Sequence, residues 1–313
     1  MEISFIIPLF NRLDLTRPCV ESLRATLPAG LPHEIILVDD GSTDGTREWL
    51  HSLERPPFVV RRNDGNRGFA YGNNRAAAIA RGRFLALVNS DLVFQPRWLE
   101  PMLRAFSRFR DTGIVGNLQF RTSTGELDHA GLIIDPKGRP EHLDHRRGHL
   151  LLPLPYSRRP AVTGACCVVE REQFLALGGF DEGFINGGED VDLCYRLRRA
   201  GLAVRVANRS RVLHHVSASP GRKRHDEQNS RRLVRKWREQ LIEDGARFWP
   251  HDYLHEHWLN PRAFDHGLLL AAVLRIAGLV PAPSSRARDI VARNIDLEEA
   301  RWRAMFGPMR IAP

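Results

Sequence analysis

Cysteine is scarce in this chain, which has four in 313 residues: Cys19, Cys166, Cys167 and Cys194. No C-x-x-C pair occurs among them, and the adjacent Cys166 and Cys167 would point to opposite faces of a strand. The cysteines therefore show no metal-binding or redox motif, and we interpret them as small buried hydrophobic residues in a reducing compartment. A chain of this length can bury a substantial core without disulfides or structural metals.

Long apolar runs are also missing. The longest candidate, residues 268–280, is interrupted by Arg275 and is too short to span a bilayer. The first residues form a strand-like run, residues 3–8, without the basic segment and the long apolar stretch of a signal peptide. These absences predict a cytoplasmic protein without a membrane-spanning segment.

Negative charge is in deficit, because 46 lysines and arginines outnumber 37 aspartates and glutamates, which gives a formal net charge of +9 and a pI of about 10.1. Such a surplus predicts anionic partners: nucleotides, membrane phospholipids, lipid-linked phosphates or nucleic acid. A basic cluster at residues 222–238 contributes to the surplus. It is typical of a solvated helix face, but it could also hold the phosphate of a ligand or another anionic partner.

Strand and helix patterns alternate in the first third of the chain. The expected strands lie at residues 3–7, 34–38, 59–60 and 84–88, and the expected helices lie at residues 14–27, 44–53, 68–80 and from Pro96 onward. Such alternation predicts a parallel sheet covered by helices. Beyond it, the sequence predicts loops and a hairpin over residues 113–160, a strand over 161–169, a helix over 190–200 and further helices from 222 onward.

Polar motifs follow three of the expected strands. The first strand ends at Pro8-Leu9-Phe10-Asn11-Arg12, the second at Asp39-Asp40-Gly41-Ser42-Thr43-Asp44, and the strand at 84–88 at Asn89-Ser90-Asp91. In an open parallel sheet, ligands bind at the carboxyl ends of the strands. Folding should therefore gather these three motifs at one edge of the sheet.

These three motifs resemble those of the inverting family-2 glycosyltransferases of the GT-A fold. Two later runs add to the resemblance, Gly178-Gly179-Phe180-Asp181-Glu182-Gly183-Phe184 and Gly188-Glu189-Asp190-Val191-Asp192-Leu193, so that it covers roughly residues 1–240 in the family's order. It implies an α/β GT-A domain over residues 1–240, with a mainly parallel, mixed central sheet flanked by helices, and a helical C-terminal extension over 241–313. It also implies transfer of a hexose or deoxyhexose from a UDP or dTDP donor to a surface glycan or a lipid-linked acceptor.

The resemblance places the donor at the first two motifs. It implies donor contacts from Pro8, Phe10, Asn11 and Arg12, together with an acid that accepts a hydrogen bond from the base. The pair Asp39 and Asp40 supplies that acid, and we favour Asp40 for the base and Asp39 for bracing the loop. Without the resemblance, the run that begins at Asp39 and Asp40 is also typical of a capped turn.

The third motif, Asn89-Ser90-Asp91, stands where the family has its Asp-x-Asp metal motif. Asn replaces the first acid here, so Asp91 is the expected metal ligand, and all three residues are expected to contact the donor. Mg²⁺ or Mn²⁺ suits carboxylate ligands and can bridge the oxygens of a diphosphate. The cation would also stabilise the charge that builds on the leaving diphosphate.

A histidine is the second expected metal ligand. His214-His215-Val216-Ser217-Ala218-Ser219 resembles the family's His-x-x-Gly-x-Ser motif, with Ser217 in place of the usual Gly, and alignment favours His214 as the ligand. A structural histidine is the alternative. The run Asp128-His129-Ala130-Gly131 is interpreted as part of an acceptor loop, with no mechanism assigned.

The acids at residues 189–192 are expected to serve the acceptor. In the family this Glu-Asp pair supplies the general base that takes the proton of the attacking hydroxyl, a role that we assign to Asp190. Glu189 and Asp192 are expected to orient Asp190 and to bind the acceptor. A single displacement with one base inverts the anomeric centre. Acids in a first helical turn also complement the helix dipole, which is the simpler explanation of the same pattern.

Two other functions stay open at this point. A sugar nucleotidylyltransferase would need a Gly-rich basic phosphate loop after the first strand, and residues 8–12 are not such a loop. A basic membrane-binding or nucleic-acid-binding module would explain the charge but not three acidic motifs at strand ends. We expect no nucleic-acid partner.

The apolar run at residues 268–280 has two interpretations. It is apolar nearly all round, which favours a helix buried against the catalytic domain or a second subunit. With basic residues on either side, it could instead seat the enzyme on the inner face of the cell membrane, as a peripheral contact near lipid-linked acceptors.

Overall fold

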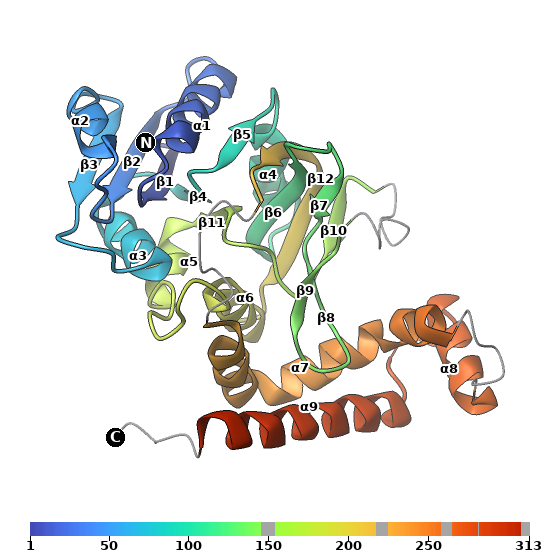
Figure 1. Ribbon diagram of the computed structural model, residues 1–313. Helices are drawn as coiled ribbons and strands as arrows, with labels where there is room; N and C mark the ends of the chain where they lie inside the picture. The colour runs from blue at the N-terminus through green and yellow to red at the C-terminus, as the bar shows by residue number, and fades with distance from the viewer. Residues whose placement is uncertain (145–153, 217–224, 258–264, 281, 308–313) are drawn as a thin grey trace. The chain divides into compact units, whose positions relative to one another are not determined.

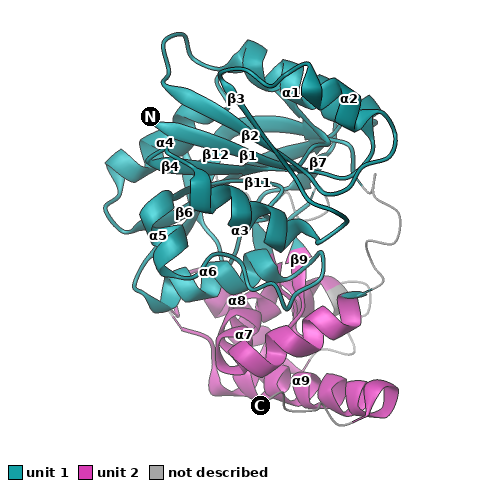
Figure 2. Ribbon diagram, turned by 90° about the vertical axis from the view of Figure 1, so that its left-hand side faces the viewer, with its two compact units in different colours: residues 1–132, 142–225 teal, residues 133–141, 226–313 magenta. Residues whose placement is uncertain are grey.

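The computed structural model of the protein describes residues 1–144, 154–216, 225–257, 265–280 and 282–307 (Figure 1). The chain divides into two compact units (Figure 2). The sheet unit comprises residues 1–132 and 142–225, and the helical unit comprises residues 133–141 and 226–313. The expected boundary after residue 240 lies within helix α7 (Asp226–His257).

A ten-stranded mixed sheet forms the centre of the sheet unit. Its strands follow the order β10-β12-β6-β11-β4-β1-β2-β3, with β5 paired to β12 and β7 paired to β6. The strands are β1 (Ile3–Leu9), β2 (His33–Asp39), β3 (Phe58–Arg62), β4 (Phe84–Val88), β5 (Leu92–Phe94), β6 (Thr112–Arg121), β7 (Leu127–His129), β10 (Tyr156–Arg158), β11 (Cys166–Glu170) and β12 (Ala203–His214). Strands β1 to β4 are parallel, as are β6 and β12, whereas β11 runs antiparallel between β4 and β6. The expected mainly parallel, mixed sheet is confirmed.

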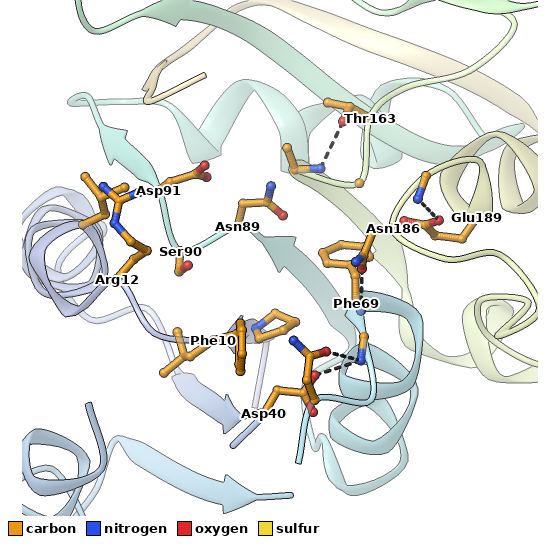
Figure 3. A pocket seen from close by; sticks show the side chains of 18 of the residues that line it. Phe10, Arg12, Asp40, Phe69, Asn89, Ser90, Asp91, Thr163, Asn186 and Glu189 are labelled. Atoms are coloured by element: carbon orange, nitrogen blue, oxygen red, sulfur yellow. Dashed lines mark hydrogen bonds between the residues drawn. The ribbon is translucent and has the colours of Figure 1, made fainter. Parts of the chain in front are cut away.

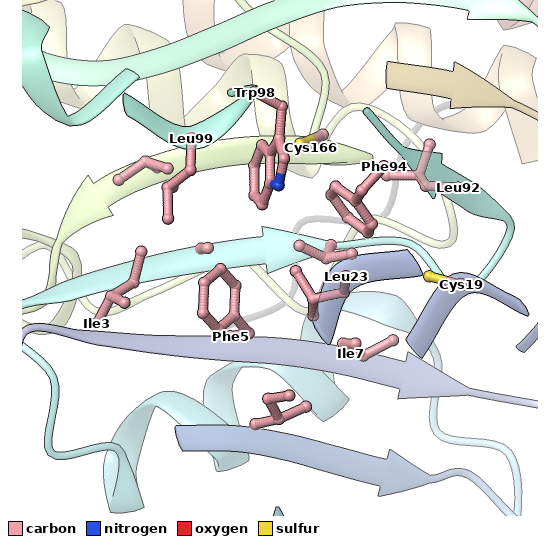
Figure 4. Close-up of a cluster of buried hydrophobic side chains, with 14 of the residues drawn as sticks. Ile3, Phe5, Ile7, Cys19, Leu23, Leu92, Phe94, Trp98, Leu99 and Cys166 are labelled. Carbon is pink, nitrogen blue, oxygen red and sulfur yellow. The ribbon is translucent and has the colours of Figure 1, made fainter. Parts of the chain in front are cut away.

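Helices cover both faces of this sheet, as expected from the alternating pattern. They are α1 (Leu13–Thr26), α2 (Thr46–His51), α3 (Phe69–Ile79), α4 (Leu99–Arg108), α5 (Arg171–Ala176) and α6 (Glu189–Arg199). Alternate residues of β1, Ile3, Phe5 and Ile7, pack against α1 and α4 around the fully buried Trp98 (Figure 4). The Trp98 ring lies 4.5 Å from that of Phe94 between centroids. Helices α3, α5 and α6 cover the opposite face.

All four cysteines are buried and unpaired with one another, which confirms their interpretation as small hydrophobic residues. Cys166 packs into the core beneath α1 and α4, together with Cys19. Burial raises the pKa of the thiols of Cys166 and Cys194 to about 12, so these side chains stay protonated and unreactive at neutral pH.

Strand β6 is a difference from the sequence-based expectation, which placed loops across its residues. Two glycines that close packing requires interrupt the strand pattern in the sequence. A Cβ added at Gly116 would lie 2.8 Å from Val162, and one at Gly113 would lie 2.9 Å from Leu202. Packing against the sheet therefore selects glycines here, although glycine is unfavourable in a strand and weakens the apolar pattern.

The helical unit contains α7, α8 (His266–Ile276) and α9 (Ser285–Phe306), so the expected helical C-terminal extension is confirmed. Residues 133–141 belong to it as well, and they include parts of β8 (Leu132–Ile134) and β9 (Pro140–His142), which form a two-stranded sheet. An ionic cluster joins this segment to the helices: Arg139 and Arg301 each contact both Glu227 and Glu298.

The apolar run at residues 268–280 forms most of helix α8 and the residues that follow it. Their exposed side chains include Leu270, Val273, Ile276 and Leu279, which are 59%, 46%, 44% and 71% exposed. These side chains are exposed in the described part of the single chain, and burial of the run against the catalytic domain or a second subunit stays a prediction. No helix within the described ranges is both long enough and apolar enough to cross a bilayer.

Candidate active site

A cavity of about 520 Å³ lies in the sheet unit, where the parallel strands β1, β2 and β4 end (Figure 3). Segments that follow β1, β2, β3 and β4 line it, together with the residues before β11, the start of α6 and the end of β12. The lining residues are Pro8, Leu9, Phe10, Asn11, Arg12, Leu15, Asp40, Asn66, Gly68, Phe69, Asn89, Ser90, Asp91, Thr163, Gly164, Ala165, Asn186, Gly187, Glu189, Asp190 and His214. The three polar motifs thus meet at one edge of the sheet, as the sequence predicts.

Two of the expected site residues, Asp39 and Asp192, are fully buried and do not line this cavity. The Oδ1 atom of Asp39 accepts a hydrogen bond from the Ser42 N–H at 2.9 Å, so Asp39 braces the loop after β2. Asp192 forms an ion pair with Arg196, one turn further along α6, at 2.8 Å. The positions of both residues suit the support of the site rather than contact with a ligand in the cavity.

The loop after β1 is fastened to the loop after β2 through Asn11. The Asn11 N–H donates to Ser42 Oγ at 2.8 Å, and the Thr43 N–H donates to Asn11 Oδ1 at 2.8 Å. Asn11 and Arg12 both adopt left-handed backbone conformations, with φ of 55° and 57°. Asparagine tolerates this conformation better than most residues do.

Asp44 links the same two loops. Its carboxylate accepts hydrogen bonds from the Leu13 N–H at 2.9 Å, at the start of α1, and from the Thr46 hydroxyl, at the start of α2. Burial acts to raise the pKa of Asp44, but these hydrogen bonds outweigh it and lower the pKa. The polar run at residues 39–44 therefore serves largely to hold together the loops at the rim of the cavity.

Asp40 fastens a third loop, the one that follows β3. Its Oδ1 accepts from the Asn63 side chain, and its Oδ2 accepts from the backbone N–H groups of Arg67 and Gly68, each at 2.8 Å. Phe10, which is 48% exposed, also lines the cavity and offers an aromatic face for stacking (Figure 3).

Asp91 and His214 face each other at one side of the cavity. Strand β5 pairs with β12 so that Leu92 lies opposite His214, and the His215 N–H donates to the Asp91 carbonyl oxygen at 3.0 Å. This pairing places His214 Nε2 3.4 Å from Asp91 Oδ1. Asp91 Oδ1 is buried and accepts no hydrogen bond from the residues that the structure describes.

Two ligands of this kind fit a hard divalent cation bound together with a diphosphate. Within the described ranges, no group of three or more histidine, cysteine, aspartate or glutamate side chains could hold a metal ion by itself. Mg²⁺ and similar ions commonly take one or two protein ligands and complete their coordination with substrate phosphates and water. The buried, unsatisfied carboxylate oxygen of Asp91 beside an imidazole suits such a shared site.

Asp190 and Glu189 line the cavity from the first turn of α6. The Gly164 N–H donates to Asp190 Oδ2 at 2.9 Å, and the Val191 N–H donates to Asp190 Oδ1 at 2.8 Å. Glu189 Oε2 accepts from the Gly187 N–H at 2.7 Å. Backbone groups therefore hold both carboxylates in fixed positions.

The sequence analysis missed three parts of the cavity lining. Residues 163–165 precede β11, and they reach the ligand edge because β11 runs opposite to its neighbours. Asn66, Gly68 and Phe69 follow β3, and the rule of carboxyl strand ends would have found them if this weak strand had been included. Asn186 and Gly187 lie between the two acidic runs that the resemblance used, and no simple pattern marks them.

Two family models match the chain, and both describe glycosyltransferases. The family model described as Glycosyl transferase family 2 matches residues 4–174, more than half of the chain, and that described as N-terminal domain of galactosyltransferase matches residues 144–217. The chain is 34% identical over 265 residues to the Sinorhizobium fredii protein y4gI and 34% identical over 227 residues to the Myxococcus xanthus O-antigen biosynthesis protein RfbC. These matches cover 78% and 70% of the chain but only 28% and 18% of the relatives' own lengths.

A third relative is matched over more of its own length. The N-acetylglucosaminyl-diphospho-decaprenol L-rhamnosyltransferase of Mycobacterium tuberculosis is 31% identical over 220 residues, which is 61% of this chain and 69% of that protein.

Solved structures share the fold. GalNAc-T7 with UDP, GalNAc and Mn²⁺ matches with a TM-score of 0.63 at 21% identity, over 80% of this chain and 50% of that one. The Pyrobaculum calidifontis mannosyltransferase PcManGT in complex with GDP-Man and Mn²⁺ matches with a TM-score of 0.58 at 15% identity, over 98% and 88% of the two chains. The expected GT-A fold is confirmed.

The hydrogen bonds of Asn11 generate a first prediction. Asn11→Ala removes the acceptor for the Thr43 N–H and forces a Cβ-bearing residue without local polar compensation into the left-handed region. Together these changes should lower the free energy of unfolding by about 1–3 kcal/mol. Urea denaturation measures this change.

Asn11→Gly is the matched control, because it removes the same acceptor but adopts a positive φ without strain. It should be the less destabilising of the two substitutions. Equal or greater destabilisation by Gly would show that backbone strain plays no part in this loop.

Proposed function

We propose that this chain, which belongs to glycosyl transferase family 2, transfers a sugar from a nucleotide-diphosphate donor to an acceptor hydroxyl with inversion at the anomeric carbon. The observation that supports the proposal most strongly is one cavity with two functional sides. Asp91 and His214 lie on one side, and Asp190 and Glu189 line it from α6. A chain of this family with that arrangement has both a place for a metal-bound diphosphate and a fixed carboxylate for the acceptor.

The donor would enter over the loops after β1, β2 and β3. Phe10 is placed to stack on a base, and Asp40 to accept a hydrogen bond from the imide N–H of uracil or thymine, beside the loop that it already fastens. Pro8, Asn11, Arg12, Asn89 and Ser90 complete this part of the cavity lining. We therefore keep a UDP or dTDP sugar as the proposed donor.

Asp91 and His214 would hold Mn²⁺ or Mg²⁺, which when bound would neutralise the charge on the leaving diphosphate. Asp91 contributes a buried carboxylate oxygen, and His214 contributes an imidazole that is 4% exposed. Arg12 adds a guanidinium at the same side of the cavity.

Asp190 would act as the general base in a single displacement. The acceptor oxygen forms a bond to the anomeric carbon while the bond from that carbon to the diphosphate oxygen breaks, and the hydroxyl proton passes to the Asp190 carboxylate. The N–H groups of Gly164 and Val191 hold this carboxylate, so little reorganisation is needed during the reaction. Glu189 is proposed to contact the acceptor, whereas the burial of Asp192 suits it to stabilising α6.

Two relatives point to the acceptor class. One is named for O-antigen biosynthesis and another for rhamnosyl transfer to a diphospho-decaprenol-linked sugar. They support a deoxyhexose or hexose as the transferred sugar and a surface glycan or its lipid-linked precursor as the acceptor. Family membership argues against a nucleotidylyltransferase and against a module without catalysis.

The donor assignment predicts that Asp91→Asn abolishes metal-dependent donor binding. A panel of UDP, dTDP and GDP sugars should include one that raises the Tm of the wild-type protein with Mn²⁺ and not without it, because a ligand that binds only the folded state stabilises it by mass action. Asp91→Asn should lose this shift while remaining folded. Asp296→Asn, the same change at an exposed position on α9, should keep it. A full shift in Asp91→Asn would contradict the assignment.

The base assignment predicts that Asp190→Asn lowers turnover by about 10²–10⁴-fold. Donor affinity should remain within a few-fold, because the base serves the acceptor. Both Asp190 oxygens accept backbone N–H groups, so the Asn variant can satisfy only one of them and should also lose about 1 kcal/mol of stability. Single-turnover kinetics at saturating donor separate these effects, and near-normal turnover would transfer the role to another residue.

A peripheral membrane contact is proposed for α8. Arg275 lies among its exposed apolar side chains, and Arg286 and Arg288 follow at the start of α9, which favours an anionic lipid surface. The protein would then work at the inner face of the membrane, next to lipid-linked acceptors.

This contact predicts that the protein sediments with anionic phospholipid vesicles and that binding weakens as salt is raised. Replacing Leu270, Val273 and Ile276 together by serine should abolish binding, because their apolar burial is lost. Leu297→Ser on α9, where the side chain is 69% exposed, is the control and should bind normally. Binding of the triple variant equal to that of the wild type would exclude α8 as the contact.

A further inference from the structure

Asp128 is a buried carboxylate that none of the roles above uses. It is 3% exposed and lies on β7, which pairs with the end of β6. The neighbouring strand β12 places His214 opposite Arg121 of β6. Three adjacent strands therefore bring Asp128, Arg121 and His214 together behind the cavity.

The two oxygens of Asp128 have different surroundings. Arg121 contacts Oδ1 through both Nε and Nη2, each at 3.1 Å. Oδ2 faces His214 Nδ1 at 3.8 Å and His142 Nδ1 at 3.9 Å. The arginine thus fixes the carboxylate with its second oxygen turned toward the imidazoles.

Asp128 Oδ2 and His214 Nδ1 could form a hydrogen bond with each other, as acceptor and donor. Both atoms are buried, and neither has a hydrogen-bond partner among the described residues. Leaving buried polar atoms unsatisfied is costly, so such atoms usually have a partner. A movement of about 1 Å would bring this pair to hydrogen-bond distance and satisfy both atoms.

The imidazole of His214 therefore lies between two carboxylates. Nε2 faces Asp91 in the cavity, and Nδ1 faces Asp128 behind it. We propose that Asp128 is a positioning residue that orients His214 and fixes its tautomer, with the proton on Nδ1 and the Nε2 lone pair available to a metal ion. The inference rests on the proposed function, in which His214 is a metal ligand. Histidine ligands in proteins generally donate their second N–H to such a partner.

The alternative is a purely structural role, in which Asp128 only neutralises Arg121. That role predicts a change in folding stability after substitution, but none in metal affinity. A positioning role predicts a change in metal affinity that disappears once His214 is gone.

The test measures the Mn²⁺ affinity of the full chain in the presence of UDP or dTDP, whichever supports binding to the wild-type protein, by the electron paramagnetic resonance signal of free Mn²⁺. Asp128→Asn should weaken Mn²⁺ binding about 10–100-fold. His214→Asn should weaken it as well, and the double variant should be no weaker than His214→Asn alone.

Asp111→Asn is the matched control, because Asp111 also pairs with arginines, Arg158 and Arg205, whereas the carboxylate that faces His214 is that of Asp128. It should bind Mn²⁺ like the wild type. Asp128→Glu, which keeps the charge beside Arg121 but alters the reach to His214, is a second variant in case Asp128→Asn does not fold, and it should show a smaller loss.

Wild-type affinity in Asp128→Asn, or an additive loss in the double variant, would overturn the positioning role and leave the proposed function intact. Failure of the wild-type protein to bind Mn²⁺ with UDP and also with dTDP would overturn both.

Discussion

Strand β11, antiparallel between the parallel strands β4 and β6, is the constraint on which the cavity depends. Its reversed direction brings residues 163–165 to the edge where the parallel strands end. There the Asn89 N–H donates to the Ala165 carbonyl oxygen at 2.8 Å, and the Gly164 N–H donates to Asp190. The metal-side motif and the acidic start of α6 are thus hydrogen-bonded to the same three-residue segment. A Cβ at Gly164 would lie 3.1 Å from the Phe69 ring, so a larger residue at this position would require the ring to shift.

The charge of the cavity differs from that of the whole chain. Although the protein has a formal net charge of +9, the cavity is lined by the acids Asp40, Asp91, Glu189 and Asp190 and by one arginine, Arg12. A doubly charged diphosphate would be repelled by this set alone, because charges in a partly buried site are poorly screened. The arrangement is consistent with the proposed binding of a divalent cation together with the donor.

Much of the fold could be predicted because β1, β2 and β4 are short apolar runs followed by polar turns. Strand β6 was not predictable in this way, since packing against Val162 and Leu202 requires glycines at two of its positions. The residues of the three strand-end motifs were found for the same reason that the strands were. The segment before β11 was missed because a sequence pattern does not show the direction in which a strand is inserted. Asp39 and Asp192 look like Asp40 and Asp190 in sequence, and only the folded structure shows that the first two are fully buried whereas the other two line the cavity.

The helical unit is built from two separate stretches of the chain, which limits how the protein can be divided. The chain passes between the two units three times, after residues 132, 141 and 225, because residues 133–141 belong with α7 and α9. Arg139 from that segment meets Glu227 and Glu298, and a Cβ at Gly138 would lie 2.8 Å from Ile295. Removing everything after residue 225 would leave a charged and apolar hairpin without its partners. The C-terminal helices therefore cannot be exchanged by themselves. An exchange of C-terminal regions between related enzymes would have to include residues 133–141 as well.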